Sequence, residues 1–140
     1  MNERGRLVVL DASAVLAWLM RERGKEIVDR MLAVAVVPAS ALTEALYRAV
    51  ERRHALPAGE LYQSLLVAGI AVEAVTEPDA VRAGELIAWS RTHDEDRLHR
   101  SLSLGDGLCI AVAERLDLVV TGGDDYWASV PMRVDYAPFR

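Results

Sequence analysis

An apolar run that stops at an acidic residue constrains this chain more than any other feature. Residues 7–10 are all apolar, and Asp11 follows them directly. The run is too short for a helix and rich in the residue types that favour strands, so it predicts a buried strand. In open α/β sheets ligands bind at the carboxyl ends of strands, which makes Asp11 a candidate site residue. The alternative is that Asp11 caps the following helix.

Strand and helix patterns alternate after this point. Helices are expected at residues 14–20 with Ser13 as cap, around 27–32, at 41–53 with Ser40 as cap, after Pro57, at 77–92 and from Ser103 to about residue 116. Strands are expected at residues 34–37, 70–75 and 118–121, with a candidate edge strand at 132–136, and residues 93–100 should form a charged loop. This alternation predicts an α/β three-layer sandwich with a central, mostly parallel sheet, in a single domain of residues 1–140.

The composition excludes several classes of protein. Hydrophobic residues make up 52% of the sequence and charged residues 26%, which is typical of a globular chain. No apolar run approaches the ~20 residues of a membrane span, and the charged start lacks the apolar core of a secretory signal. Cys109 is the only cysteine, so an internal disulfide is excluded and a reducing, cytoplasmic location is expected.

Charge is distributed unevenly along the chain. The formal net charge of −5 argues against non-specific coating of nucleic acid. Residues 1–60 hold nine Lys/Arg and eight Asp/Glu, whereas residues 61–140 hold seven and thirteen. Contacts to a polyanion should therefore come from the first half, with metal ions between the later carboxylates and the phosphates. Candidate phosphate-binding residues are Arg21, Arg23, Lys25, Arg48 and Arg52, and a solvated surface explains each equally well.

Asp106 is placed unusually for a charged residue. It shares a helical face with apolar residues such as Cys109 and Ile110. Because burying a lone charge costs several kcal/mol, the carboxylate is expected to look out of the edge of the core. The alternative is a capping box formed by Ser103 and Asp106.

Asp124 follows the strand at residues 118–121 much as Asp11 follows the first strand. Acids at two neighbouring strand ends would meet at one edge of a parallel sheet. Ordinary turn chemistry also explains Asp124, and Asp125 is a rival for the same role. Glu44 lies opposite the apolar stripe centred near Leu42 and Leu46, so periodicity alone predicts a surface residue.

Four blocks of the sequence resemble the motif blocks of a PIN domain. They are Leu10-Asp11-Ala12-Ser13-Ala14-Val15, Ala41-Leu42-Thr43-Glu44-Ala45-Leu46, Leu102-Ser103-Leu104-Gly105-Asp106 with Cys109-Ile110-Ala111, and Val120-Thr121-Gly122-Gly123-Asp124 with Trp127. They occur in order over nearly the whole chain, and the most similar type is the VapC-like toxin ribonuclease of toxin–antitoxin pairs. The resemblance implies a PIN-like sandwich and a metal-dependent endoribonuclease. The catalytic residues that it implies are Asp11, Glu44, Asp106 and Asp124.

The last block departs from the family pattern. Relatives usually read Thr-x-Asp, and that spacing falls on Gly123 here. Asp124 keeps the family's separation from the aromatic residue Trp127, so it is the expected fourth acid, with Asp125 as the alternative. If neither acid reaches the metals, the site is degraded and turnover is slow.

A cluster of carboxylates repels itself unless a cation joins it. Mg²⁺ or Mn²⁺ is the expected cofactor, since both prefer oxygen ligands. Asp11 and Asp106 are the expected main metal ligands, with Asp124 as a further ligand and Glu44 orienting or deprotonating the attacking water. Hydrogen-bond support is expected from Ser13 and Thr121.

The expected substrate is single-stranded RNA, such as a loop, which an open acidic edge can reach. The resemblance also implies two protein partners, an antitoxin that covers the active edge and a second copy of the chain in a homodimer. The alternative to an enzyme is a catalytically degraded PIN-like domain that binds RNA or another protein.

Overall fold

The computed structural model describes residues 5–93 and 100–140. Its elements are β1 (Val8–Leu10), α1 (Ala12–Leu19), α2 (Lys25–Met31), η1 (Leu32–Val34), β2 (Ala35–Pro38), α3 (Ala39–Glu51), α4 (Ala58–Val67), β3 (Ala71–Glu73), α5 (Glu77–Thr92), α6 (Leu104–Leu116), β4 (Val119–Thr121) and η2 (Asp125–Ser129). Most of the expected charged loop, residues 94–99, lies outside the described residues. In the described ranges, no helix combines the length and apolar character that a bilayer crossing requires.

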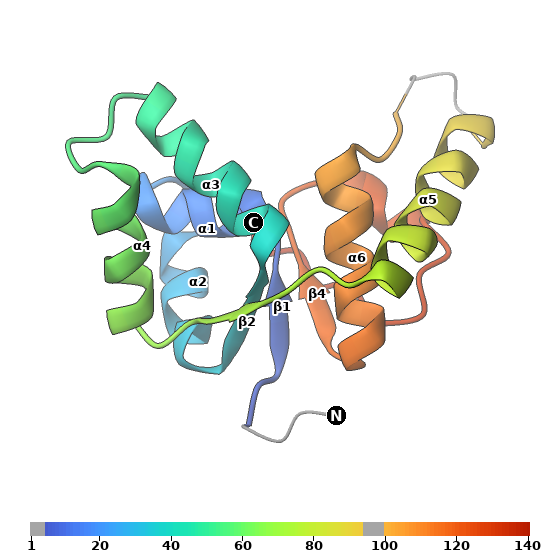
Figure 1. Cartoon of the computed structure of the whole chain (residues 1–140), viewed down its shortest axis with the longest axis horizontal. Helices are drawn as coiled ribbons and strands as arrows, with labels where there is room; N and C mark the ends of the chain where they lie inside the picture. The colour runs from blue at the N-terminus through green and yellow to red at the C-terminus, as the bar shows by residue number, and fades with distance from the viewer. Residues whose placement is uncertain (1–4, 94–99) are drawn as a thin grey trace.

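The strands form one parallel sheet in the order β3-β2-β1-β4. Successive strand residues point to opposite faces, so β1, β2 and β4 each contribute to two cores. Val8 and Leu10 of β1 pack with α1, α2, α3 and α4, whereas Val9 packs with α5, α6 and β4 residues. Figure 1 shows these two helical layers on either side of the sheet. The predicted α/β sandwich with a parallel sheet is confirmed.

The chain order across the sheet reverses at β1. From β1 the chain proceeds outward to β2 and β3, and it then returns to place β4 on the other side of β1. Because βαβ crossovers keep one hand, connections that run in opposite directions cover opposite faces. The segments that follow β1 and β4 accordingly pack in different cores, α1 in one and η2 in the other. Such a switch point is where open α/β sheets bind ligands.

Residues 132–136 do not form the expected edge strand. Only an isolated parallel bridge joins Tyr136 to Val120. The following residues nevertheless run along β4, since the N–H of Ala137 donates to Val120 O and that of Phe139 donates to Gly122 O. Phe139 is fully buried in the core of α1 to α4. It lies against Gly24, where a Cβ would approach the Phe139 ring to 2.6 Å.

Two expected helix caps are wrong. Helix α1 begins at Ala12, and its cap is Asp11, whose carboxylate accepts the N–H of Ala14 at 2.8 Å. The aspartate is the better cap because its charge favours a helix N-terminus. Helix α3 begins at Ala39 directly after Pro38, and Ser40 is already helical.

Candidate active site

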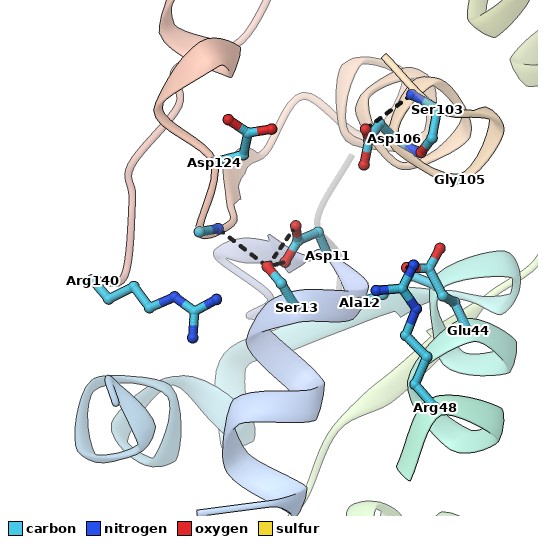
Figure 2. A pocket seen from close by; sticks show the side chains of 12 residues that line it. Asp11, Ala12, Ser13, Glu44, Arg48, Ser103, Gly105, Asp106, Asp124 and Arg140 are labelled. Carbon is cyan, nitrogen blue, oxygen red and sulfur yellow. Dashed lines mark hydrogen bonds and ion pairs between the residues drawn. The ribbon is translucent and has the colours of Figure 1, made fainter. Parts of the chain in front are cut away.

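The acidic residues predicted from the sequence line one cavity at the carboxyl ends of β1 and β4. Its volume is about 330 Å³. Four different segments contribute one carboxylate each: Asp11 follows β1, Glu44 lies in α3, Asp106 lies in α6 and Asp124 precedes η2. Figure 2 shows Asp11 at the centre of this group.

Asp11 is the most buried of these carboxylates, with 7% of its surface exposed. The N–H of Ala14 and the hydroxyl of Ser13 donate to it, at 2.8 Å and 2.7 Å. The pKa of Asp11 is nevertheless raised to about 7, because burial and, less strongly, the negative charges of Asp106 and Glu44 outweigh those two hydrogen bonds. The charged form of Asp11 is thus held at a cost that a nearby cation would relieve.

Ser13 joins α1 to the loop after β4. Its hydroxyl donates to Asp11 and accepts the backbone N–H of Gly123 at 3.1 Å (Figure 2). The prediction that the Thr121 hydroxyl supports the acids by a hydrogen bond is wrong, because this hydroxyl donates to the carbonyl of Ala137. Thr121 instead contributes its backbone carbonyl, which accepts the N–H of Asp11 at 3.0 Å.

Asp106 both caps its helix and lines the cavity. Its Oδ2 accepts the N–H of Ser103 at 3.0 Å, and the Ser103 hydroxyl accepts the N–H of Asp106, which completes a capping box. The alternative prediction for Asp106, a capping box with Ser103, is therefore confirmed. It does not exclude a role of Asp106 in the site. Burial raises the pKa of Asp106, the hydrogen bonds from Ser103 oppose that rise, and the charge of Asp124 adds to it.

Glu44 is closer to the core than its periodicity indicates. The buried residues of α3 are Ala41, Ala45 and Ala49, while Leu42 and Leu46 are only partly buried. A stripe centred on the larger leucines points to the wrong face, because alanines allow the close approach of α1. Glu44 then lies on the flank of the buried face, 26% exposed, where Arg48 pairs with it at 3.3 Å.

Asp124, rather than Asp125, lines the cavity. Its carboxylate accepts the N–H of Tyr126 at 2.9 Å and so caps η2. The Asp125 side chain is 96% exposed and lies 3.6 Å from Arg100. The geometry thus favours Asp124 as the fourth acid, one residue later than the usual family spacing.

Comparison with known proteins identifies the family. A family model for the PIN domain matches residues 8–131. The chain belongs to the PIN-domain family. The sequence blocks that resemble a PIN domain therefore led to the correct family. No match to this PIN domain was found among curated proteins.

Several solved toxin structures share the fold of this PIN domain. VapC20 of Mycobacterium tuberculosis, a toxin that cleaves the sarcin–ricin loop, is 21% identical with a TM-score of 0.67, over 87% of this chain and 94% of that one. VapBC2 of Rickettsia felis, bound to a promoter DNA fragment, is 14% identical with a TM-score of 0.66, over 94% and 98%. DNA-bound VapBC of Salmonella typhimurium is 13% identical with a TM-score of 0.69, over 96% and 99%.

Two arginines line the acidic cavity of this PIN domain, Arg48 and Arg140. Of these two, only Arg48 was among the predicted phosphate-binding residues. Arg52, also predicted, lines an adjoining cavity, whereas Arg21 and Lys25 line a separate cavity beside Trp18. Arg23 is exposed and lines none of these three cavities. No pattern in the sequence indicates Arg140, because only the folded path of residues 135–139 along β4 brings it to the site.

The donor set of the cavity fits a hard divalent cation. All four acids offer carboxylate oxygens, the ligands that Mg²⁺ and Mn²⁺ prefer. Two glycines leave room for them: a Cβ on Gly105 would lie 2.7 Å from Glu44 Oε1, and one on Gly122 would lie 2.6 Å from Asp11 Oδ2. Within residues 5–93 and 100–140, no three His, Cys, Asp or Glu side chains are close enough as placed to hold one ion. Direct coordination of one ion by three of these side chains therefore requires the carboxylates to turn inward.

Proposed function

We propose that this PIN domain is a divalent-metal-dependent endoribonuclease and the toxin of a VapBC-type toxin–antitoxin pair. The observation that carries the proposal is the convergence of four acidic side chains from separate segments on one cavity at the switch point of the sheet. Membership of the PIN family supports it. The fold shared with VapC20, which cleaves the sarcin–ricin loop, also supports it.

The residues of the cavity take different roles in this proposal. Asp11 and Asp106 are the main ligands of Mg²⁺ or Mn²⁺, and Asp124 is a further ligand, direct or through water. A bound cation supplies a water of lowered pKa and neutralises charge on the phosphate. Glu44 orients the attacking water or accepts its proton, and Arg48 holds Glu44 in position through their ion pair. Asp11 must be deprotonated to bind the cation, so protons compete with metal below about pH 7.

The proposed substrate is a flexible, single-stranded segment of RNA, such as a loop, because its phosphates can enter an open cavity. The proposed partners are an antitoxin protein and a second copy of the chain, in the cytoplasm. The solved VapBC complexes with this fold support an antitoxin partner.

Substitution of the central carboxylates tests the proposal. Purified wild-type protein is expected to cut single-stranded and loop RNA when Mg²⁺ or Mn²⁺ is present and to lose activity in EDTA. Asp11→Asn and Asp106→Asn should each lower the cleavage rate by roughly 10³-fold or more, as expected when one group of a catalytic unit is removed. Asp125→Asn is the matched control, because this exposed carboxylate does not line the cavity.

Two results would contradict the proposal. Normal cleavage by both central variants would exclude the carboxylate mechanism. Absence of cleavage by inhibitor-free wild-type protein at every metal concentration would instead favour the catalytically degraded binding domain. In cells, expression of the chain alone should arrest growth, and co-expression of the neighbouring open reading frame should relieve the arrest.

A further inference from the structure

A second, smaller cavity of about 110 Å³ adjoins the acidic one. The two cavities share the residues Ala12, Ser13, Glu44, Arg48 and Arg140. The smaller cavity adds Arg52 and Glu22 from the side of α1 and α3. The two cavities therefore form one continuous hollow, in which Arg48 and Arg140 lie between the acidic cluster and Arg52.

The three arginines differ in the partners that they already have. Arg48 pairs with Glu44 at 3.3 Å, and Arg52 pairs with Glu22 at 3.1 Å. Arg140 forms no ion pair or side-chain hydrogen bond with any residue in the described part of the chain, and its guanidinium lies 5.0 Å from the centre of the Phe139 ring. Its donors are thus available to an anion, although acidic side chains line the same cavity.

Contacts of the preceding residue with the core and with the end of β4 fix the position of Arg140. The preceding Phe139 is fully buried, and its N–H donates to Gly122 O. A Cβ on Gly123 would lie 2.8 Å from Arg140 Nε, so the absence of a side chain at residue 123 leaves room for the guanidinium. Figure 2 shows Arg140 and Arg48 on opposite sides of Ser13, below Asp11.

We infer that Arg140 is a substrate-positioning residue, which binds the RNA phosphate next to the one held at the acidic cluster. This inference rests on the proposed function. A single RNA strand carries a phosphate at every nucleotide, so a strand with one phosphate among the carboxylates presents the next within the same hollow. A planar guanidinium with unpaired donors suits that phosphate. The strand accordingly continues from the acidic cavity past Arg140 into the adjoining cavity that Arg52 lines.

Equilibrium binding to a non-cutting protein tests the inference without relying on catalysis. Affinity of a fluorescein-labelled single-stranded RNA is measured by anisotropy for Asp106→Asn protein, with and without the second change Arg140→Gln, over a range of salt concentrations. Loss of one phosphate contact should reduce the slope of log affinity against log salt by about 0.7, which is about a fivefold weaker affinity at 0.1 M salt. Arg140→Lys should restore most of the slope, since it keeps the charge. Arg133→Gln is the matched control, an exposed arginine in the same segment that lines neither cavity.

The outcomes separate this inference from the proposed function. Equal binding by the Arg140→Gln and Arg133→Gln proteins would overturn the inference, even if the wild type cuts RNA. RNA binding that depends on Arg140 in a protein that never cuts would support the inference and contradict the nuclease. In an active background, Arg140→Gln should raise KM with little change in kcat, and the reverse pattern would contradict a positioning role. Unchanged thermal unfolding of Arg140→Gln confirms that the fold is intact.

Discussion

Asp79 and Asp106 occupy the same local motif and have opposite electrostatic environments. Each is the third residue of a helix and completes a capping box, with Thr76 at the start of α5 and Ser103 at the start of α6. Burial acts to raise both pKa values. At Asp79 the hydrogen bonds from Arg115, at 3.0 Å, and from Thr76 reverse the effect and lower its pKa. At Asp106 no hydrogen-bonded arginine is present among the described residues, and the pKa stays raised.

The difference shows how this fold treats two kinds of buried carboxylate. Asp79 is only 2% exposed, and Arg115 links it to Glu73 and to the carbonyl of Ala74. The positive charge of Arg115 compensates the charge of Asp79. The resulting contacts join α5, α6 and β3. The carboxylates of the cavity receive helix N–H groups and the Ser13 hydroxyl, and in the described part of the chain Arg48 is the one arginine that forms an ion pair with any of them. They depend on a cation from outside, which is the electrostatic basis of the proposed metal site.

The largest effect that tests this comparison is expected in the pH dependence of the free energy of unfolding. In metal-free buffer the folded protein keeps the Asp11 proton up to about pH 7, while the unfolded chain releases it near pH 3.8. Because the folded state keeps this proton in this window, the contribution of Asp11 to the free energy of unfolding should fall as pH rises from about 4 to about 7, by about 4 kcal/mol as an upper bound. Asp11→Asn should remove this fall and be more stable than wild type at pH 8. The measurement is urea unfolding at a series of pH values.

The control for this experiment is Asp125→Asn, which removes an exposed carboxylate and should leave the pH dependence unchanged. Equal pH dependence of the wild type and Asp11→Asn between pH 4 and 7 would show that Asp11 is not strained by its burial.

Removal of the arginine that compensates the charge of Asp79 should lower the free energy of unfolding, the opposite of the effect expected for Asp11→Asn. Arg115→Met keeps much of the apolar stem and leaves a buried carboxylate without its partner. The free energy of unfolding at pH 7 should fall by about 3 kcal/mol, as for other broken buried pairs. Urea unfolding measures the change, with Arg91→Met on the exposed face of α5 as control. Equal effects of the two substitutions would mean that Asp79 needs no compensation.

The smallest effect is expected at the residue before each aspartate. That residue is Pro78 in the Asp79 box and Gly105 in the Asp106 box, where a Cβ would touch Glu44 Oε1. Gly105→Ala should displace Glu44 and lower RNA cleavage about tenfold, as when a supporting group of a site is lost. Its stability should change by less than about 1 kcal/mol, since alanine favours the helix while Glu44 must move.

Gly84→Ala is the matched control for this substitution, because Gly84 is also helical and a Cβ there meets nothing within 4 Å. It should stabilise the protein by up to about 1 kcal/mol and leave cleavage unchanged. Equal cleavage by the two alanine variants would show that the position of Glu44 does not depend on Gly105.

The sequence was sufficient to predict the features that depend on local patterns. The alternation of strand and helix patterns predicted the parallel sheet, and the acids that follow two of the strands, Asp11 and Asp124, predicted the edge where they meet. The capping motif of Asp106 was visible as a spacing of three residues. These features succeed because strand ends and helix starts are encoded by neighbouring residues.

Features set by distant contacts were not predictable in the same way. Periodicity alone predicted Glu44 on the surface, and only the resemblance to a PIN domain made it a site residue, because hydrophobicity weights leucine above alanine, whereas close helix packing in α3 selects Ala41 and Ala45. The hydroxyl of Thr121 is taken by a carbonyl of the segment that follows η2. Arg140 reaches the cavity only because that segment runs beside β4. In each case the deciding partner is far away in the chain.

The place of β4 beside β1 also determines when the proposed nuclease can exist during synthesis. A ribosome makes the chain from its N-terminus, and domains fold as their segments emerge. Asp11 therefore appears early, but the strand that brings Asp124 to it is the last of the sheet to be made. The proposed active site is therefore incomplete during synthesis. Its set of four acids comes together only after β4 has been made and has docked beside β1.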